Sequence, residues 1–250
     1  MKRVIAVLLC MTMLLSLMGC GAAGASDKKW VIATETYFKP FEYTNENNEF
    51  VGIDVDIIAA IAKDQGFSYD LVPLGWDAGV TACKTGQADA VLAAASITEE
   101  RTEDGWLFSD GYYDSCLVFA VSEDSSISSL SDLKDLNVAV KKGTISEDYA
   151  LSLSDQYGFN VSVFDDTPSV YQDVLYGDSA ACIDDEPVLT AAIKDGMTLS
   201  LLNEGQSDPS QYALAVLSKS NKKLIKMFNE GLANIKADGT YQQILDKYLK

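Results

Sequence analysis

Hydrophobic positions along the chain alternate between strand-like and helix-like spacing. WVIAT (30–34) is apolar and β-branched, as expected of a buried strand, whereas the apolar residues of 51–66 recur at helical spacing. We expect this helix to open at Asp54 and to stop at Gly66. The series continues with a strand at 67–74, a helix at 76–86 and a strand at 88–95. Such alternation predicts an α/β fold with a parallel or mixed sheet flanked by helices.

A second series of strands and helices follows a polar, serine-rich stretch at 122–133. A strand pattern at 115–122 precedes this stretch; after it, strand patterns occur at 136–140, 160–164 and 180–183, and helical patterns at 144–158 and 169–177. The C-terminal part returns to a strand at 212–217, then to a helical run at 221–239 and a last amphipathic turn pattern at 240–249. One large domain or two smaller ones are expected, because about 230 residues exceed the usual size of a single domain.

The N-terminus has the pattern of a bacterial export signal. Two basic residues precede an apolar stretch that ends at Leu17 and is too short to span a bilayer comfortably. The stretch runs into LMGC, which resembles the lipobox of bacterial lipoproteins. We therefore expect 1–19 to be a signal peptide, Cys20 to be lipidated and 20–27 to form a flexible tether. Ordinary cleavage near Ala25 is the alternative.

The composition excludes several classes of function. The formal net charge is −18, and so acidic a chain disfavours nucleic-acid partners, which are bound mainly through basic patches. The absence of histidine removes imidazole general bases, Ser-His and Cys-His nucleophile pairs and the commonest metal ligand. The acidic segment 54–56 lacks the further oxygens and the glycine of a calcium loop, so no metal site and no cofactor are expected.

Three cysteines lie beyond Cys20, each among apolar or small neighbours. Cys83, Cys116 and Cys182 cannot all pair with one another, and their spacing contains no CxxC motif. We expect them to be small core residues, with a disulfide between two of them as the alternative.

A lone arginine stands among acids in AAASITEERTED (93–104). Slim residues before Arg101 would suit a site that grips a small anion, because a guanidinium can donate two parallel charge-assisted hydrogen bonds to a carboxylate. The alternative is an exposed arginine neutralised by Glu100 or Asp104.

The order of motifs resembles that of the polar amino-acid-binding proteins of ABC importers, solute-binding protein family 3. KPFEYTNENNEFVGIDVDIIAAIAKDQGF, SITEER, FSDGYYDS, VAVKKGT and DDEPV carry the resemblance, which runs from about residue 30 to the end. VGIDVD, IAKDQGF, SITEER and DDEPV together look most like the glutamine-binding lipoproteins of Gram-positive bacteria.

This resemblance implies an α/β fold of the two-lobe, periplasmic-binding-protein-like type II, with two hinge strands and the ligand in the interlobe cleft. Lobe one is expected at 28–112 plus 213–250 and lobe two at 113–212, with hinges near 113–116 and 209–212. A ligand that touches both lobes would favour the closed state through contacts that only this state allows.

The resemblance also implies how the ends of an α-amino acid would be held. Arg101 takes the place of the arginine that forks onto the α-carboxylate, and Thr144 with the following backbone amide closes on the same group from a helix start. The carbonyl of Ala94 and the hydroxyl of Ser96 would contact the α-ammonium, and the Ser96 amide the carboxylate. Asp185 matches the acid that pairs with the ammonium; its alternative role is a helix N-cap.

Four further residues would surround the ligand side chain. Phe38 and Trp76 stand where the family carries aromatic rings, with a core role as the alternative. Glu35 and Lys141 align with an aspartate and a lysine that bond the two ends of a side-chain amide, which favours glutamine. A glutamate at this place also occurs in relatives that bind cystine, and Asp184 adds an acid that would suit arginine or lysine.

The resemblance thus implies a lipid-anchored, extracytoplasmic and monomeric receptor. It would pass a polar L-amino acid to a membrane permease that is driven by a separate ATPase, and it would not be an enzyme. A rival from another class is a cyclohexadienyl dehydratase-like lyase, in which Glu186 or Glu35 would transfer protons. A sensor or adhesion role on the same scaffold stays open.

Overall fold

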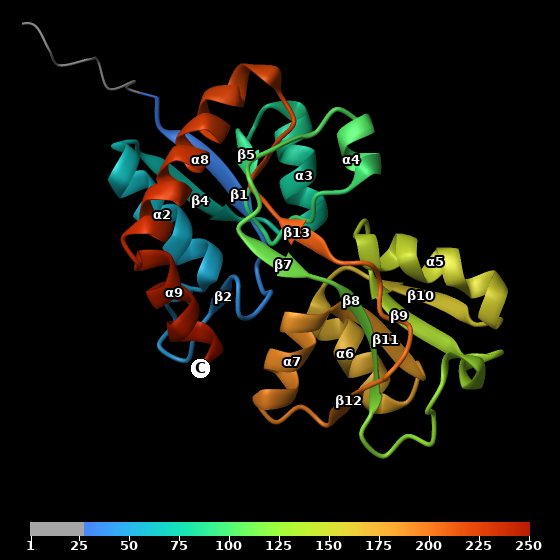
Figure 1. Ribbon diagram of the computed structural model, residues 1–250. Helices are drawn as coiled ribbons and strands as arrows, with labels where there is room; N and C mark the ends of the chain where they lie inside the picture. Colours follow the sequence, from blue (N-terminus) through green and yellow to red (C-terminus); the bar gives the residue numbers. More distant parts are fainter. Residues whose placement is uncertain (1–27) are drawn as a thin grey trace, which may run out of the picture.

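The structure, a computed structural model, describes residues 28–250 as two α/β lobes joined by two short strands (Figure 1). The strands β7 (Tyr113–Ser115) and β13 (Ser210–Tyr212) pair antiparallel between the lobes. The predicted signal peptide, Cys20 and the tether lie outside the described residues. Within 28–250, no helix has the length and apolar character that a membrane span requires.

The first lobe is built on a five-stranded sheet with the strand order β4-β1-β5-β14-β6. Its strands are β1 (Trp30–Thr34), β4 (Tyr69–Pro73), β5 (Ala90–Val91), β6 (Leu107–Phe108) and β14 (Ala215–Val216). Its helices are α2 (Ile53–Gln65), α3 (Trp76–Thr85), α4 (Glu99–Glu103), α8 (Lys222–Ala237) and α9 (Thr240–Leu249), with a 3-10 turn η2 (Lys219–Asn221) and a small hairpin of β2 (Tyr43–Thr44) and β3 (Phe50–Val51). β1 runs parallel to β4 and β5, and β14 runs antiparallel to β5 and β6.

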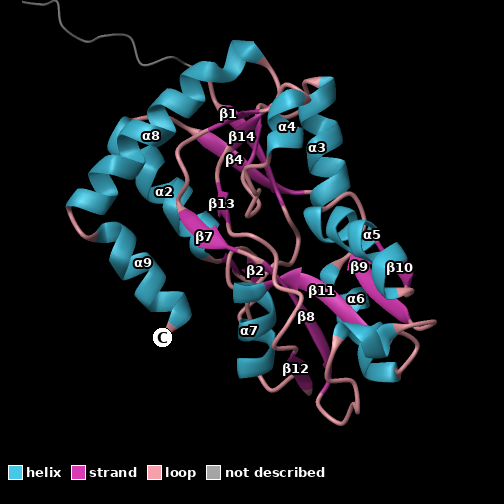
Figure 2. Ribbon diagram, turned by 45° about the vertical axis from the view of Figure 1, so that its right-hand side comes forward, coloured by secondary structure: helices cyan, strands magenta, loops and turns pink. Residues whose placement is uncertain are grey.

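The second lobe is built on a sheet with the strand order β10-β9-β11-β8-β12. Its strands are β8 (Leu117–Ser122), β9 (Asn137–Lys141), β10 (Asn160–Phe164), β11 (Ala181–Asp185) and β12 (Leu199–Leu201). Its helices are α5 (Ile145–Tyr157), α6 (Thr167–Tyr176) and α7 (Glu186–Lys194), with a 3-10 turn η1 (Leu130–Leu133). The core contacts place α5 on one face of this sheet and α6 and α7 on the other (Figure 2).

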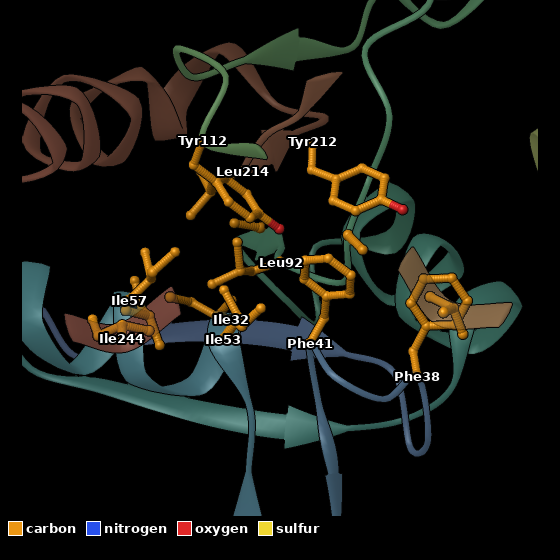
Figure 3. Close-up of a cluster of buried hydrophobic side chains, with 14 of the residues drawn as sticks. Ile32, Phe38, Phe41, Ile53, Ile57, Leu92, Tyr112, Tyr212, Leu214 and Ile244 are labelled. Carbon is orange, nitrogen blue, oxygen red and sulfur yellow. The ribbon is translucent and has the colours of Figure 1, made fainter. Parts of the chain in front are cut away.

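The core of the first lobe forms where α2 packs on the sheet. Ile53 and Ile57 of α2 face Ile32 of β1, Leu92 and Leu214, and all five are fully buried (Figure 3). Burying such a side chain stabilises the fold by about 1.5–3 kcal/mol. Of the three positions whose spacing predicted this helix, Ile58 and Ile61 are fully buried and Val55 is half-buried.

The helix α2 begins one residue earlier than predicted, and Asp54 is not its N-cap. The cap is Gly52, at φ 144°, and a β-carbon there would lie 2.0 Å from the carbonyl oxygen of Phe41. Glycine is required by this close approach. Asp54 instead lies inside the first turn, where its side chain is buried.

Two predicted strands are shorter than expected. The run at 88–95 contains only the strand Ala90–Val91, because Ala94 has a left-handed backbone with φ 47° and turns the chain. The run at 212–217 divides into the end of β13 and the separate strand β14. The helix α4 was not predicted, and α7 was considered only through the alternative that Asp185 is a helix N-cap.

The cysteines of the described residues are free thiols. Cys83 and Cys182 are buried, as predicted, and burial raises the pKa of Cys83 to about 12. Cys116 is only half-buried, and its sulfur accepts a hydrogen bond from Gln206 at 2.8 Å.

Candidate functional site

A cavity of about 370 Å³, including its mouth, lies between the two lobes. The lining comes from both lobes: Phe38, Trp76, Ala93, Ala94, Ser96 and Arg101 from the first, and Lys141, Thr144, Ile145, Ser146, Asp184 and Asp185 from the second. Nine of the ten residues predicted from the sequence are among them, and the tenth, Glu35, contacts Lys141. Their roles toward a ligand stay predictions.

Arg101 is held in place without an acidic partner. Its Nη1 donates to the carbonyl of Ser96 at 2.8 Å, and its guanidinium lies over the rings of Trp76 and Trp106, at 4.7 and 5.2 Å from their centroids. No carboxylate of residues 28–250 forms a salt bridge with it, so the alternative of a surface pair with Glu100 or Asp104 is not what the structure shows. Burial lowers the pKa of Arg101 to about 10, which leaves it cationic at neutral pH.

The start of α5 faces Arg101 from the second lobe. Thr144 is the N-cap, but its hydroxyl donates to the carbonyl of Lys141 at 2.6 Å instead of capping the helix. The amides of Ile145 and Ser146 have no hydrogen-bond partner among residues 28–250, and both residues line the cavity. Free amides at a helix N-terminus attract anions. Both lobes therefore offer free N–H donors to this corner of the cavity.

Asp185 offers a free hydrogen-bond acceptor to the cavity through one of its two carboxylate oxygens. Its Oδ1 accepts hydrogen bonds from Tyr212 at 2.6 Å and from Ser115 at 3.1 Å, whereas its Oδ2 has no partner in 28–250. It occupies the N-cap position of α7, but its side chain makes no capping bond, so the capping alternative is wrong for the side chain. Burial, with the charge of Asp184 added, raises the pKa of Asp185 to about 7.

Glu35 and Lys141 contact each other directly across the lobes. Lys141 Nζ lies 2.6 Å from Glu35 Oε2, and both side chains are buried. The expected gap for a ligand amide between these two groups is therefore absent in this conformation. Glu35 also accepts from the amide of Trp76 at 3.1 Å and from that of Thr36 at 2.8 Å, so its carboxylate is held from several directions.

Asp184 and Phe38 complete the wall beside Lys141. Asp184 accepts from the hydroxyl of Tyr171 at 2.8 Å and from the amide of Asp185 at 2.9 Å. Burial raises the pKa of Asp184, and the positive charge of Lys141 opposes this rise. Phe38 lies under the ammonium of Lys141, with 4.9 Å between the nitrogen and the ring centroid.

The sequence did not single out Trp106 or Ser146. Trp106 stacks on Trp76 with 6.2 Å between ring centroids and thereby backs the guanidinium of Arg101. Ser146 contributes by its backbone position in the first turn of α5. A predicted helix start pointed to the free amides, whereas nothing in the local sequence points to Trp106.

Comparisons with known proteins agree with this architecture. The ArtP arginine-binding extracellular protein of Bacillus subtilis (strain 168) is 27% identical over 99% of this chain and 98% of its own length. An ancestral arginine-binding protein has been solved bound to arginine and bound to glutamine. Each structure is 32% identical with a TM-score of 0.81; they cover 89% and 90% of this chain, and this chain covers 98% and 99% of them.

A second solved relative is the substrate binding domain 2 of Lactococcus lactis GlnP in an open conformation. It is 39% identical with a TM-score of 0.61, over 92% of this chain and 98% of that one. The pattern of the bacterial extracellular solute-binding proteins, family 3, matches residues 30–250. Because this match covers nearly all described residues, the chain belongs to the bacterial extracellular solute-binding proteins of family 3.

Proposed function

We propose that the protein is an extracytoplasmic, monomeric receptor that captures a polar L-amino acid for an ABC importer, with glutamine as the favoured ligand. The observation that carries this proposal is the distribution of free hydrogen-bonding groups in the cavity. Arg101 and the amides of Ile145 and Ser146 offer donors at one end, and Asp185 Oδ2 offers an acceptor. An α-amino acid carries a carboxylate and an ammonium that match these groups.

Glutamine is favoured by the groups around the ligand side chain. Lys141 has three N–H donors and gives one to Glu35, so it can donate to a carboxamide oxygen. The carboxamide NH₂ can donate to Glu35 or Asp184. A guanidinium would face the like charge of Lys141. Arginine is nevertheless the second candidate, because Asp184 lines the cavity and both ArtP and the ancestral protein are named for arginine.

The closed arrangement of the lobes supports capture between them. Trp76 Nε1 donates to the carbonyl of Gly143 across the cleft at 2.6 Å, and Lys142 pairs with Asp77 at 3.1 Å. The fold is also closer in shape to the ligand-bound ancestral protein than to the open GlnP domain, although the latter is more similar in sequence. The two contacts across the cleft can form only when the lobes are closed.

A lyase is not favoured by the positions of its candidate acids. Glu186 is not part of the cavity lining and accepts from Thr190 at 3.0 Å. Glu35 is engaged by Lys141 and by two backbone amides. Neither is free to transfer a proton to a bound molecule, so we propose that the protein is not an enzyme.

A thermal-shift screen of the twenty amino acids, on protein refolded to remove bound ligand, tests the receptor proposal. A ligand present at about 100 times its dissociation constant should raise the free energy of unfolding by about 2.7 kcal/mol. We expect glutamine to give the largest shift and glutamate and aspartate to give none. A screen in which no amino acid raises the melting temperature would contradict the receptor, and dehydration of prephenate or arogenate would support the lyase.

Ligand affinity is expected to depend on pH through Asp185. Because its pKa is raised above the ordinary 3.8, ionising Asp185 costs the ligand-free fold stability as pH rises toward 7, and a bound ammonium offsets this cost. Below about pH 7, ligand binding should release a proton from Asp185. Each further drop of one pH unit should then lower the ligand affinity by up to about tenfold.

Calorimetry in buffers of different ionisation enthalpy measures this release. The control is Asp185→Asn, which should bind all amino acids more weakly and release no proton. Equal heats in all buffers for the unmodified protein would remove Asp185 from the ammonium site, as would a loss in Asp185→Asn confined to one ligand.

We also propose that Cys20 carries a lipid anchor after removal of 1–19. Cys20→Ser should then move the protein from the membrane fraction to the soluble fraction without changing its ligand affinity, because acyl chains supply the attachment. Cell fractionation with mass spectrometry measures this. Membrane retention of the variant, with uncleaved precursor ruled out by mass, would contradict the anchor.

A further inference from the structure

Three polar side chains are buried together behind the wall of the cavity in the first lobe. Glu42, Asp54 and Tyr112 are 0%, 1% and 2% exposed. Both carboxylate oxygens of Glu42, Oδ1 of Asp54 and the hydroxyl of Tyr112 have no hydrogen-bond partner among residues 28–250. Burial and the adjacent acid raise the pKa of Glu42 well above 4.5, and burial raises that of Asp54 to about 6. Burial and the neighbouring carboxylate of Asp54 thus favour the neutral form of Glu42.

The remaining oxygen of Asp54 reaches the cavity wall. Asp54 Oδ2 accepts a hydrogen bond from the backbone amide of Ala94 at 2.8 Å, and Ala94 lines the cavity. Ala94 has φ 47°, a left-handed conformation that the β-carbon of an alanine disfavours. The bond to Asp54 thus holds a conformation that the residue would not adopt by itself.

We propose that Asp54 is a positioning residue for the ligand, which holds the left-handed turn at Ala94 and so presents the Ala94 carbonyl to the α-ammonium. The inference rests on the proposed capture of an α-amino acid. Rotation of Ala94 out of this turn would also displace Ser96, whose carbonyl holds Arg101. Asp54 would then act on both ends of the ligand without touching it.

The local sequence VGIDVD explains how Asp54 reaches this place. Gly52 allows the helix start to approach Phe41 more closely than any other residue could. The first turn of α2 then directs Asp54 toward the strand end at Ala94. The helix N-terminus favours the ionised form of an acid in its first turn, which is the form that accepts from an amide.

The test measures glutamine affinity in three variants. Two are the single variants Asp54→Ala and Asp54→Asn, and the third is a double variant that combines Asp54→Ala and Ala94→Gly. Asp54→Ala leaves the Ala94 amide without an acceptor and should weaken binding by about tenfold or more. Asp54→Asn keeps an acceptor oxygen and should stay within about threefold. Adding Ala94→Gly to Asp54→Ala should restore most of the affinity, because glycine adopts positive φ freely, without restoring the thermal stability lost at position 54.

Two results would overturn the inference while the unmodified protein still binds amino acids. One is an affinity of Asp54→Ala for glutamine that lies within about threefold of the affinity of the unmodified protein. The other is a double variant that regains no affinity, which would make the role of Asp54 only structural. If Asp54→Ala does not fold, hydrogen exchange at the Ala94 amide decides: we expect protection in the unmodified protein and in Asp54→Asn, and rapid exchange in the unmodified protein would contradict the bond. An unmodified protein that binds no amino acid would overturn the proposed function, and this inference with it.

Discussion

Replacing Arg101 with alanine is expected to weaken the binding of every α-amino acid by about 10²–10⁴-fold and to leave the fold intact. The loss is large because the ligand carboxylate would be enclosed between the lobes without its counter-charge, and breaking such a buried pair costs about 3–5 kcal/mol. The fold should persist, because α4 contributes no buried residue and the Arg101 side chain makes one hydrogen bond to a carbonyl and lies over two ring faces. Calorimetry measures the affinity, and circular dichroism checks the fold.

The matched control for this variant is Arg101→Lys. It keeps the charge but lacks the planar fork, so it should bind more tightly than Arg101→Ala and more weakly than the unmodified protein. Arg101 is the only arginine of residues 28–250, so no neighbouring arginine can replace it. If Arg101→Ala lost less than about fivefold in ligand affinity, Arg101 would not be the residue that binds the ligand carboxylate.

Replacing Lys141 with methionine is expected to change which ligand binds best. Glutamine loses the donor to its carboxamide oxygen and should weaken by about 1.5–3 kcal/mol, the usual worth of a hydrogen bond to a charged group. Glu35 loses its counter-charge at 2.6 Å and becomes a buried, unpaired carboxylate in the closed state. Arginine can replace that charge, so its affinity should be unchanged or higher. Titrations of both ligands into both proteins measure the difference.

The neighbouring Lys142→Met is the control for loss of an interlobe ion pair. Lys142 pairs with Asp77 across the same cleft at 3.1 Å, but it is exposed and does not line the cavity, so its removal should cost little for either ligand. Equal losses of glutamine and arginine in Lys141→Met would mean that the lysine acts on lobe closure alone. The carboxamide hypothesis would then be wrong, as it would be if arginine bound tightest to the unmodified protein, and Asp184 would become the leading specificity residue.

Apolar spacing predicted most helices and strands close to their observed bounds. The helix predicted at 76–86 is found at Trp76–Thr85, with one side buried, and the strand 160–164 has its predicted bounds. The helix α4 was missed. α4 has no buried residue, and a helix of this kind leaves no apolar pattern in the sequence.

The conformation of the cavity wall could not be predicted from the sequence. The run around Ala94 reads as a buried strand, but Ala94 has a left-handed backbone, and its amide donates to Asp54, forty positions earlier in the chain. Asp54 itself reads as a helix cap, since capping is the common role of an acid at a helix start. Both errors arise because local patterns carry no information on which distant group a side chain meets.

The resemblance to a family indicated which residues line the cavity, but it did not predict how these residues contact one another. It brought Arg101, Thr144 and Asp185 to one cavity, but it placed Glu35 and Lys141 on opposite sides of a ligand amide. In the structure the two groups are in contact. Alignment with a family indicates which residues face the cleft, whereas the distance between them depends on how far the lobes close.

A crystal structure of the protein with L-glutamine, grown after removal of any bound ligand, would show which groups hold the ligand. We expect the α-carboxylate on the guanidinium of Arg101 and the amides of Ile145 and Ser146, and the α-ammonium on Oδ2 of Asp185. The carboxamide oxygen should lie within hydrogen-bond distance of Lys141 Nζ, about 2.7–3.2 Å. An empty cleft at saturating glutamine, or a ligand whose α-carboxylate points toward Lys141, would contradict this expectation.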